Sequence, residues 1–379
     1  ASTVHVSADF GPYGAARDRA VESALAHTGD ELVRSGSPYA VSPGRVRKGD
    51  GTPYRVYSPF YRAWTSHGWR APATAPASLP WATGVPSDGI PTADRDQPDA
   101  QVCQPRQTQP SQPELPEAGE EAALARWQHF HETALDHYAD DRNRPDLDGS
   151  SRLSVHLKYG ELHPRTLLAE LGDSKSHEVF RKELAWREFY ADVLHHAPDT
   201  ARDYLRPEFA AMSYDIGPNA DTRLEAWQQG RTGYPIVDAG MRQLLAEGWM
   251  HNRVRMIVAS FLVKDLHLEW QVGARWFMRH LVDGDIASNS HGWQWTAGCG
   301  TDAAPYFRIF NPITQGLRFD PDGDYVRRYV PELRHLPGKQ AHEPWDAEDG
   351  HLTDYPERIV DHSVERQESL ARYALIKQQ

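Results

Sequence analysis

The side chains best suited to chemistry lie in one short stretch, Asp-Gly-Asp-Ile-Ala-Ser-Asn-Ser-His-Gly-Trp-Gln-Trp at residues 283–295. The stretch places two carboxylates, an amide and two indoles beside apolar segments. A buried carboxylate without a partner is costly, so Asp283 and Asp285 should cap a helix, lie at a surface or face a ligand that donates hydrogen bonds. Because Asp and Gly are also common in turns, a capped turn and a ligand site both remain open.

Tryptophans are concentrated around this stretch. Trp270, Trp276, Trp293 and Trp295 fall within 26 residues, and Trp249 lies just upstream. Indoles usually pack in a core, but a dense set that flanks polar groups also suits a large aromatic cofactor. The sequence therefore indicates either an aromatic core or a cofactor pocket in the carboxy-terminal half.

A second polar set lies on a predicted helix at residues 179–194. Glu183, Trp186, Arg187 and Tyr190 follow one another at i, i+3, i+4 and i+7, so they share one face of the helix. A solvated face with a Glu–Arg pair would explain the charges. Trp and Tyr beside those charges favour a recognition surface instead.

Serines mark a third candidate position, Ser-Ser-Arg-Leu-Ser at 150–154. Serine before an apolar helical pattern usually caps the helix, and we favour that interpretation. The alternative is that the free amides and hydroxyls of this helix start hold a phosphate.

The elements that must position these residues are mainly helices. Apolar periodicity predicts helices over residues 124–141, 179–194, 235–247, 254–266, 270–281 and 363–376, with Gly248 ending the third. The amino-terminal region reads as a short strand from Thr3, a helix over 15–26 and further short apolar stretches. A parallel sheet needs more strand-and-crossover units than these residues supply, so we expect an α/β domain that begins partway through its sheet.

Composition divides the chain. Residues 72–116 contain ten prolines and many small polar residues, which cannot form a core, so this part should be an extended linker. We therefore expect an α/β domain at 1–71, a linker at 72–118 and a helical domain at 119–379.

Charge and cysteine content exclude some classes of protein. The net charge of −12 argues against a protein that coats nucleic acid by bulk attraction, although a local site remains possible. Cys103 and Cys299 are the only cysteines and have no zinc-site spacing, so we expect neither a disulfide framework nor a metal. No apolar run is long enough to span a bilayer. We expect a cytoplasmic monomer that does not bind membranes.

Six strings of residues occur in order along the chain. They are Ser-Arg-Leu-Ser at 151–154, Glu-Leu-Ala-Trp-Arg-Glu-Phe-Tyr at 183–190, Thr-Gly-Tyr-Pro-Ile-Val-Asp-Ala at 232–239, Gly-Trp-Met-His-Asn-Arg at 248–253, Asp-Gly-Asp at 283–285 and Trp-Gln-Trp at 293–295. With them the chain resembles the DNA photolyase and cryptochrome family, most closely the bacterial class I cyclobutane pyrimidine dimer photolyases. The resemblance implies an incomplete Rossmann-like α/β domain joined by a long linker to an all-helical FAD-binding domain.

The resemblance further implies that the helical domain holds FAD in a bent conformation. Asn289 would face the redox-active nitrogen of the flavin ring, where an amide can hydrogen-bond to both the protonated and the unprotonated form. The implied FAD-binding residues are Tyr138, Ser150, Ser151, Arg152, Leu153, Ser154, Arg187, Asn252, Asp283, Gly284, Asp285 and Asn289.

UV-damaged DNA is the implied partner. Trp186 and Trp295 would pack against an extruded pyrimidine dimer, and Glu183 would hydrogen-bond to it. The residues implied to contact DNA are Arg142, Glu183, Trp186, Arg187, Asn252, Arg253, Met256, Trp295 and Gln315.

The implied reaction is light-driven and has no net redox change: excited, reduced flavin gives an electron to the dimer, the cyclobutane ring splits, and the electron returns. Glu183, Asn289, Trp293 and Trp270 are the implied catalytic residues, the two tryptophans matching the first members of the chain that reduces oxidised flavin. Gly217 stands where many relatives have the third tryptophan, and Tyr214 is a possible substitute. We therefore predict slow or rerouted photoreduction.

Other functions are compatible with parts of the sequence. A cryptochrome-like flavin photosensor without repair turnover is the main alternative, although Glu183, Trp186, Met256 and Trp295 favour repair. A non-catalytic helical scaffold would require that the protein lacks flavin. The stretch Phe-Gly-Pro-Tyr-Gly at 10–14 resembles relatives that use a deazaflavin antenna, but the shortened α/β domain could also bind no antenna.

Overall fold

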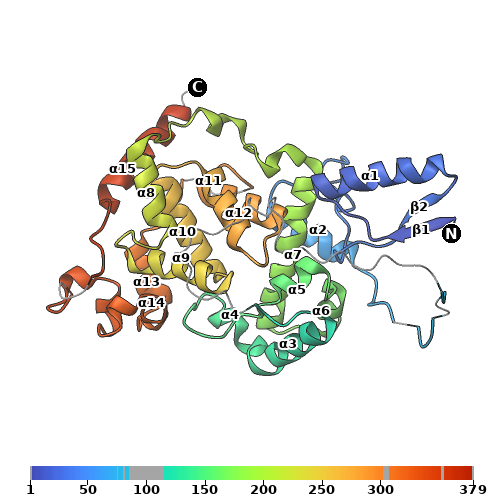
Figure 1. Cartoon of the computed structure of the whole chain (residues 1–379), viewed down its shortest axis with the longest axis horizontal. Coiled ribbons are helices and arrows are strands. Elements are labelled where there is room, and N and C mark those ends of the chain that lie inside the picture. Colours follow the sequence, from blue (N-terminus) through green and yellow to red (C-terminus); the bar gives the residue numbers. More distant parts are fainter. Residues whose placement is uncertain are drawn as a thin grey trace.

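A computed structural model of the chain describes residues 2–74, 76–79, 82–84, 115–301, 307–350 and 354–377. A small α/β unit comes first, with strand β1 (Thr3–Val6), helix α1 (Pro12–His27) and strand β2 (Glu31–Arg34). The two strands pair in parallel, with Thr3 opposite Glu31, and α1 makes the crossover between them (Figure 1). The predicted strand and helix are confirmed, and the helix begins earlier because Pro12 suits its first turn.

Helices and short turns make up the rest of the described chain. The helices are α2 (Tyr57–His67), α3 (Glu120–Thr133), α4 (Tyr138–Asp141), α5 (Ser154–Tyr159), α6 (Pro164–Glu170), α7 (Lys175–His196), α8 (Pro218–Gln228), α9 (Pro235–Glu247), α10 (Asn252–Lys264), α11 (Trp270–His280), α12 (Ile286–Ala297), α13 (Pro312–Phe319), α14 (Asp324–Tyr329) and α15 (His362–Ile376). Single turns of 3₁₀-helix lie at Leu135–His137, Pro198–Ala201, Pro207–Ala211, Pro331–Leu333, Gly338–Ala341 and Pro344–Asp346. The mainly helical prediction is confirmed for this region.

One predicted helix ends earlier than expected. The helix expected over 124–141 stops at Thr133, because Ala134 leaves the helical conformation and a 3₁₀ turn follows. Ser176, at the start of α7, accepts a hydrogen bond from the amide of Ala139 (3.1 Å) and donates one to the carbonyl oxygen of Asp136 (2.7 Å). These contacts from another helix fix the new direction of the chain, which periodicity along one segment does not reveal.

Two large apolar clusters and a third, smaller one around Tyr39 form the core of the described residues. The larger one is centred on α9, α10 and α11 and includes the fully buried Val258, Phe261 and Leu262. The second surrounds α7 and includes Phe60 and Trp64 from α2. Helix α7 therefore lies between the amino-terminal unit and the helical body, as Figure 1 shows.

A buried carboxylate fastens the amino-terminal unit to α7. Glu188, 2 % exposed, accepts hydrogen bonds from the amides of Ala40 and Val41 (3.0 Å for Val41) and from the indole nitrogen of Trp64 (2.6 Å). Burial raises the pKa of Glu188, and the three donors oppose that shift. The joint positions the segment after β2 against the helix that carries Glu183 and Trp186.

Parts of the predicted linker, including residues 85–114 with Cys103, lie outside the described residues. Within the described ranges, no helix has both the length and the apolar character that a bilayer span requires. The same ranges contain no group of three or more His, Cys, Asp or Glu side chains arranged to hold a metal ion.

Candidate active site

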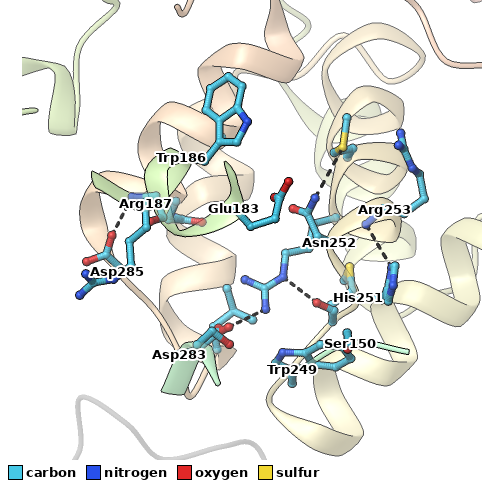
Figure 2. Close-up of a pocket in the computed structure, with 18 of the residues that line it drawn as sticks. Ser150, Glu183, Trp186, Arg187, Trp249, His251, Asn252, Arg253, Asp283 and Asp285 are labelled. Carbon is cyan, nitrogen blue, oxygen red and sulfur yellow. Dashed lines mark hydrogen bonds and ion pairs between the residues drawn. The ribbon is translucent and has the colours of Figure 1, made fainter. Parts of the chain in front are cut away.

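A cavity of about 550 Å³ opens between α7, α10 and α12 and the segment from Tyr138 to Lys158 (Figure 2). Its volume is within the range of small-molecule and cofactor sites. Glu183 and Asn252 extend into it from α7 and α10, and Asp283 and Asp285 lie further along its wall (Figure 2). The cavity therefore collects polar side chains from segments far apart in the sequence.

The two aspartates of the Asp-Gly-Asp stretch have different surroundings. Asp285 caps α12, because its side chain accepts a hydrogen bond from the amide of Ser288 (2.8 Å), so the predicted capped turn is confirmed. Asp283 is buried and pairs with Arg255 through Oδ2 (2.8 Å), whereas its Oδ1 is buried without a hydrogen-bond partner in the described structure. Both residues also line the cavity, so the capped turn leaves the predicted ligand site possible.

Helix α12 lies tightly against α11. The side-chain amide of Asn289 donates to the carbonyl oxygen of Ala274 (3.0 Å). An added Cβ at Gly273 would lie 2.1 Å from Cη2 of Trp293, so glycine is needed for the indole to approach α11. At Gly292, which also lines the cavity, an added Cβ would have no neighbour within 4 Å.

The serine-rich segment does not form the expected cap. Helix α5 starts at Ser154 after Leu153, and its first turn has no side-chain cap. The carbonyl oxygens of Ser150 and Ser151 instead accept hydrogen bonds from Arg126. Arg152 has φ 53°, and its guanidinium lies 4.3 Å from the ring centroid of Trp249. The favoured serine cap is wrong, because long-range contacts from α3 hold this backbone in place.

Charged and aromatic side chains on α7 form another wall. Glu183 pairs with Arg142 (2.5 Å), and burial raises the pKa of Glu183 while Arg142 opposes the rise. The ring of Trp186 stacks on Tyr57 of α2, with centroids 3.7 Å apart and planes 7° apart. The half-buried Glu183, Trp186, Arg187 and Tyr190 therefore form a site wall, not a solvated face.

Two further arginines are fixed near this wall. Arg187 donates to the carbonyl oxygens of Pro38 (2.9 Å) and Leu157 (3.1 Å). Arg253 donates to the side-chain oxygen of Asn143 (2.7 Å). Both guanidinium groups are held by neutral oxygen acceptors in these bonds, and both line the cavity.

Most of the sequence-predicted site residues line this one cavity. They are Tyr138, Arg142, Ser150, Ser151, Arg152, Leu153, Ser154, Glu183, Trp186, Arg187, Asn252, Arg253, Met256, Asp283, Asp285, Asn289, Trp293 and Trp295. Trp270, Gly284 and Gln315 are not among the lining residues: Trp270 is buried in the core behind it, and Gln315 lies on α13. Whether each lining residue binds FAD or DNA stays a prediction.

Several lining residues escaped the sequence analysis. Arg255, Phe277 and Ser288 all reach the cavity, and Arg255 is the partner of Asp283. The need of a buried carboxylate for a cation was a usable signal, but it did not identify which arginine supplies the charge.

The cavity suits FAD on three observations. The unpaired Oδ1 of Asp283 can accept a hydrogen bond from a ring N–H or a ribityl hydroxyl. The open space at Gly292 leaves room for a ring close to the backbone of α12. Aromatic side chains such as Trp249 and Phe277 alternate with polar ones along the lining, as in pockets for large heteroaromatic ligands.

The chain matches two sequence families. Residues 180–375 match the family described as the FAD binding domain of DNA photolyase, and residues 1–78 match the family described as DNA photolyase. Among curated proteins, the deoxyribodipyrimidine photo-lyase of Escherichia coli is 42 % identical over 369 residues, covering 94 % of this chain and 75 % of the relative. That of Alkalihalophilus pseudofirmus is 41 % identical over 370 residues with the same coverage.

Solved structures show the same likeness. A bacterial class III photolyase from Agrobacterium tumefaciens superimposes with a TM-score of 0.87 at 40 % identity, covering all of this chain and 80 % of the other. A cryptochrome from Synechocystis gives a TM-score of 0.82 at 28 % identity, covering 98 % and 79 % of the two chains.

Proposed function

Because the chain belongs to the DNA photolyase family and binds FAD, we propose that it splits cyclobutane pyrimidine dimers in UV-damaged DNA under light. The observation that supports this substrate most is the continuity of the cavity. The same volume is lined by Asp283 and Asn289 and by Trp186, Trp295 and several arginines. A flavin and a flipped-out dimer could therefore meet in one cavity.

When bound in its reduced form and excited by light, FAD supplies the electron that opens the cyclobutane ring and accepts it again afterwards. Asp283, held by Arg255, offers its free oxygen to a donor on the cofactor. Asp285 and Ser288 fix the start of α12, and the bond from Asn289 to Ala274 sets the direction of the amide. These residues orient the cofactor before any light is absorbed.

The lesion would be held by the wall on α7 and by Trp295. Photolyases take their target nucleotides out of the stack, and a damaged base costs less to extrude than a normal one. Trp186, supported from behind by Tyr57, provides a flat platform for the pyrimidines. Burial raises the pKa of Glu183 while Arg142 opposes the rise, and the carboxyl group lines the cavity, where it can hydrogen-bond to an extruded pyrimidine.

Phosphate contacts would come from the arginines around the cavity. Arg142 and Arg253 line it, and Arg308 lies 5.1 Å from the ring centroid of Trp295. Such contacts position a duplex without reading its sequence. The site can therefore work in a chain of net charge −12, because only the local charge has to attract DNA.

The test is blue-light repair of an oligonucleotide with one defined thymine dimer, using protein with chemically reduced flavin. We expect restoration of intact thymines in the light and none in the dark. Glu183→Ala should lower the repair yield per absorbed photon, whereas Glu183→Gln, which keeps a hydrogen-bond donor, should lower it less. Bound flavin without repair would instead favour the photosensor function.

A further inference from the structure

The aromatic neighbour of Trp270 outside the cavity is a tyrosine. Trp270 begins α11 and is 1 % exposed, and its ring lies edge-on to the half-buried Tyr204, with centroids 6.2 Å apart and planes 83° apart. Gly217, the position expected for a third tryptophan, lies before α8 with φ 91° and carries no side chain. The path away from Trp270 therefore leads to a phenol.

Tyr204 belongs to a directed chain of hydrogen bonds. Its hydroxyl donates to Oε1 of Glu269 (3.3 Å), the residue immediately before Trp270. Burial raises the pKa of both Tyr204 and Tyr214, and a hydrogen bond from Tyr214 to the Tyr204 oxygen opposes the rise at Tyr204 and adds to it at Tyr214. Because Tyr214 acts as a donor to this oxygen, the carboxylate of Glu269 is the acceptor for the hydrogen of Tyr204.

We propose that Tyr204 is the terminal electron donor of the relay that reduces the flavin, with Glu269 as its proton acceptor. This inference rests on the proposed electron-transfer function of the site. Burial raises the pKa of Tyr204 to about 12, so it is a neutral phenol at physiological pH and has a proton to give. A phenol that loses an electron becomes a strong acid, so a base within hydrogen-bonding distance makes its oxidation favourable.

The step balances in electrons and protons. The oxidant would be bound, oxidised FAD excited by light, which would draw one electron from Trp293, and an electron from Trp270 would replace it. One electron moves from Tyr204 to the oxidised Trp270, and one proton moves from the Tyr204 oxygen to Glu269. The products are a neutral tyrosyl radical and a neutral carboxylic acid.

The surroundings of Trp270 explain why its positive charge, once it is oxidised, is passed to Tyr204. Its indole nitrogen is buried and has no hydrogen-bond partner in the part of the chain that the structure describes. An oxidised Trp270 therefore has no acceptor there for its own proton and keeps its positive charge. Transfer to Tyr204 neutralises that charge, because the phenolic proton has Glu269 to go to.

The cavity end of the proposed electron-transfer path, at Trp293, is close-packed. The indole of Trp293 contacts α11 at Gly273, one turn after Trp270. A second branch leads from Trp293 to Trp227, whose ring centroid is 6.1 Å away. Trp227 is fully buried and its nitrogen donates to the carbonyl oxygen of Val258 (3.0 Å), which is not a base, so an electron vacancy there is not trapped by proton loss.

The test is time-resolved absorption with electron paramagnetic resonance on flavin-loaded, oxidised protein carrying ring-deuterated tyrosine. In the unsubstituted protein, we expect a tryptophan radical signal that decays as a tyrosyl signal rises, more slowly in D₂O. Tyr204→Phe should abolish the tyrosyl signal and shorten the life of the separated charges. Glu269→Gln should slow tyrosyl formation about 100-fold, the low end of what a positioned base contributes.

Two controls make the result specific. Tyr159→Phe removes the hydroxyl of an exposed tyrosine on α5 and should leave every signal unchanged. Tyr214→Phe should keep the tyrosyl radical but lower its yield, because the oxygen of Tyr204 loses the hydrogen bond that helps to orient its hydroxyl group. A tyrosyl signal that survives Tyr204→Phe, or an unchanged rate in Glu269→Gln, overturns the proposal.

Repair by chemically reduced protein separates this inference from the proposed function, because that assay bypasses the relay. Tyr204→Phe should then repair a thymine dimer as well as the unsubstituted protein does. A selective loss of repair in Tyr204→Phe would contradict a role confined to the relay. Failure of both proteins would refute the repair function, while the radical signals would still decide the role of Tyr204.

Discussion

Two glycines on neighbouring helices should respond oppositely to alanine. In Gly273→Ala the new methyl carbon would lie 2.1 Å from Cη2 of Trp293 and 2.6 Å from a methyl group of Leu262, both buried. Overpacking of this kind costs about 1–3 kcal/mol, and the better helix propensity of alanine offsets about 1 kcal/mol of it. We expect a net loss of up to about 2 kcal/mol in the free energy of unfolding.

Gly292→Ala provides the matched comparison, because its methyl carbon has nothing within 4 Å. The flavin-free protein should gain about 0.5–1 kcal/mol from helix propensity. Since Gly292 lines the cavity, the same methyl group should weaken FAD binding. Gly273→Ala should also weaken it, but indirectly, because Trp293 has to move.

Urea unfolding of the flavin-free variants and fluorescence titration with FAD measure these quantities. The cause is checked by repeating Gly273→Ala in a Trp293→Leu background, where the smaller side chain removes the collision and the cost should fall toward zero. Equal stability of Gly273→Ala and Gly292→Ala, or an undiminished cost in the Trp293→Leu background, would refute the packing argument.

Four further outcomes are expected. Asn289→Ala should make reduced flavin reoxidise faster in air, measured by absorbance, and an unchanged rate would count against its predicted role. Glu188→Ala leaves three buried donors without an acceptor, each costing about 1–3 kcal/mol, so urea unfolding should show a loss of at least about 2 kcal/mol. Tyr57→Leu removes the ring behind Trp186 and should weaken binding of dimer-containing DNA by about 0.5–1.5 kcal/mol in a fluorescence titration, with undamaged DNA unaffected. Burial lowers the pKa of His291 to about 4, below its value of about 6.5 in the unfolded chain, which therefore binds the proton first. Stability should fall by up to about 3 kcal/mol as the pH drops from about 6.5 to 4, and His291→Asn should flatten that part of the curve.

The helices that sequence predicted well are those whose signals are local. Pro235 and Gly248 bound α9, and Gly248 has the expected left-handed conformation with φ 63°. Helix α7 shows the predicted periodicity and extends beyond it in both directions, from Lys175 to His196. Such signals depend on residues a few positions apart, so one segment of the sequence is enough to predict where the helix begins and ends.

The features that sequence analysis missed depend on distant partners. The serine segment at 150–154 is held by Arg126, and the break after Thr133 is held by Ser176. Tyr57 and Trp186 stack across 129 positions of the chain. The assignment of most site residues came from the family resemblance, because spacing alone did not decide between a core, a turn and a pocket.

The packing of α12 on α11 connects the two light-dependent parts of the site. Trp293 lies on the cavity side of this contact and Trp270 on the other, so a change in the distance between the helices alters both the cofactor pocket and the relay. Trp186 depends on a different contact, between α7 and α2. Gly273→Ala should therefore impair flavin binding and photoreduction together, while the affinity for dimer-containing DNA falls less than in Tyr57→Leu. If Gly273→Ala lowered the DNA affinity as much as Tyr57→Leu does, the contact of α12 with α11 and the contact of α7 with α2 would not act independently.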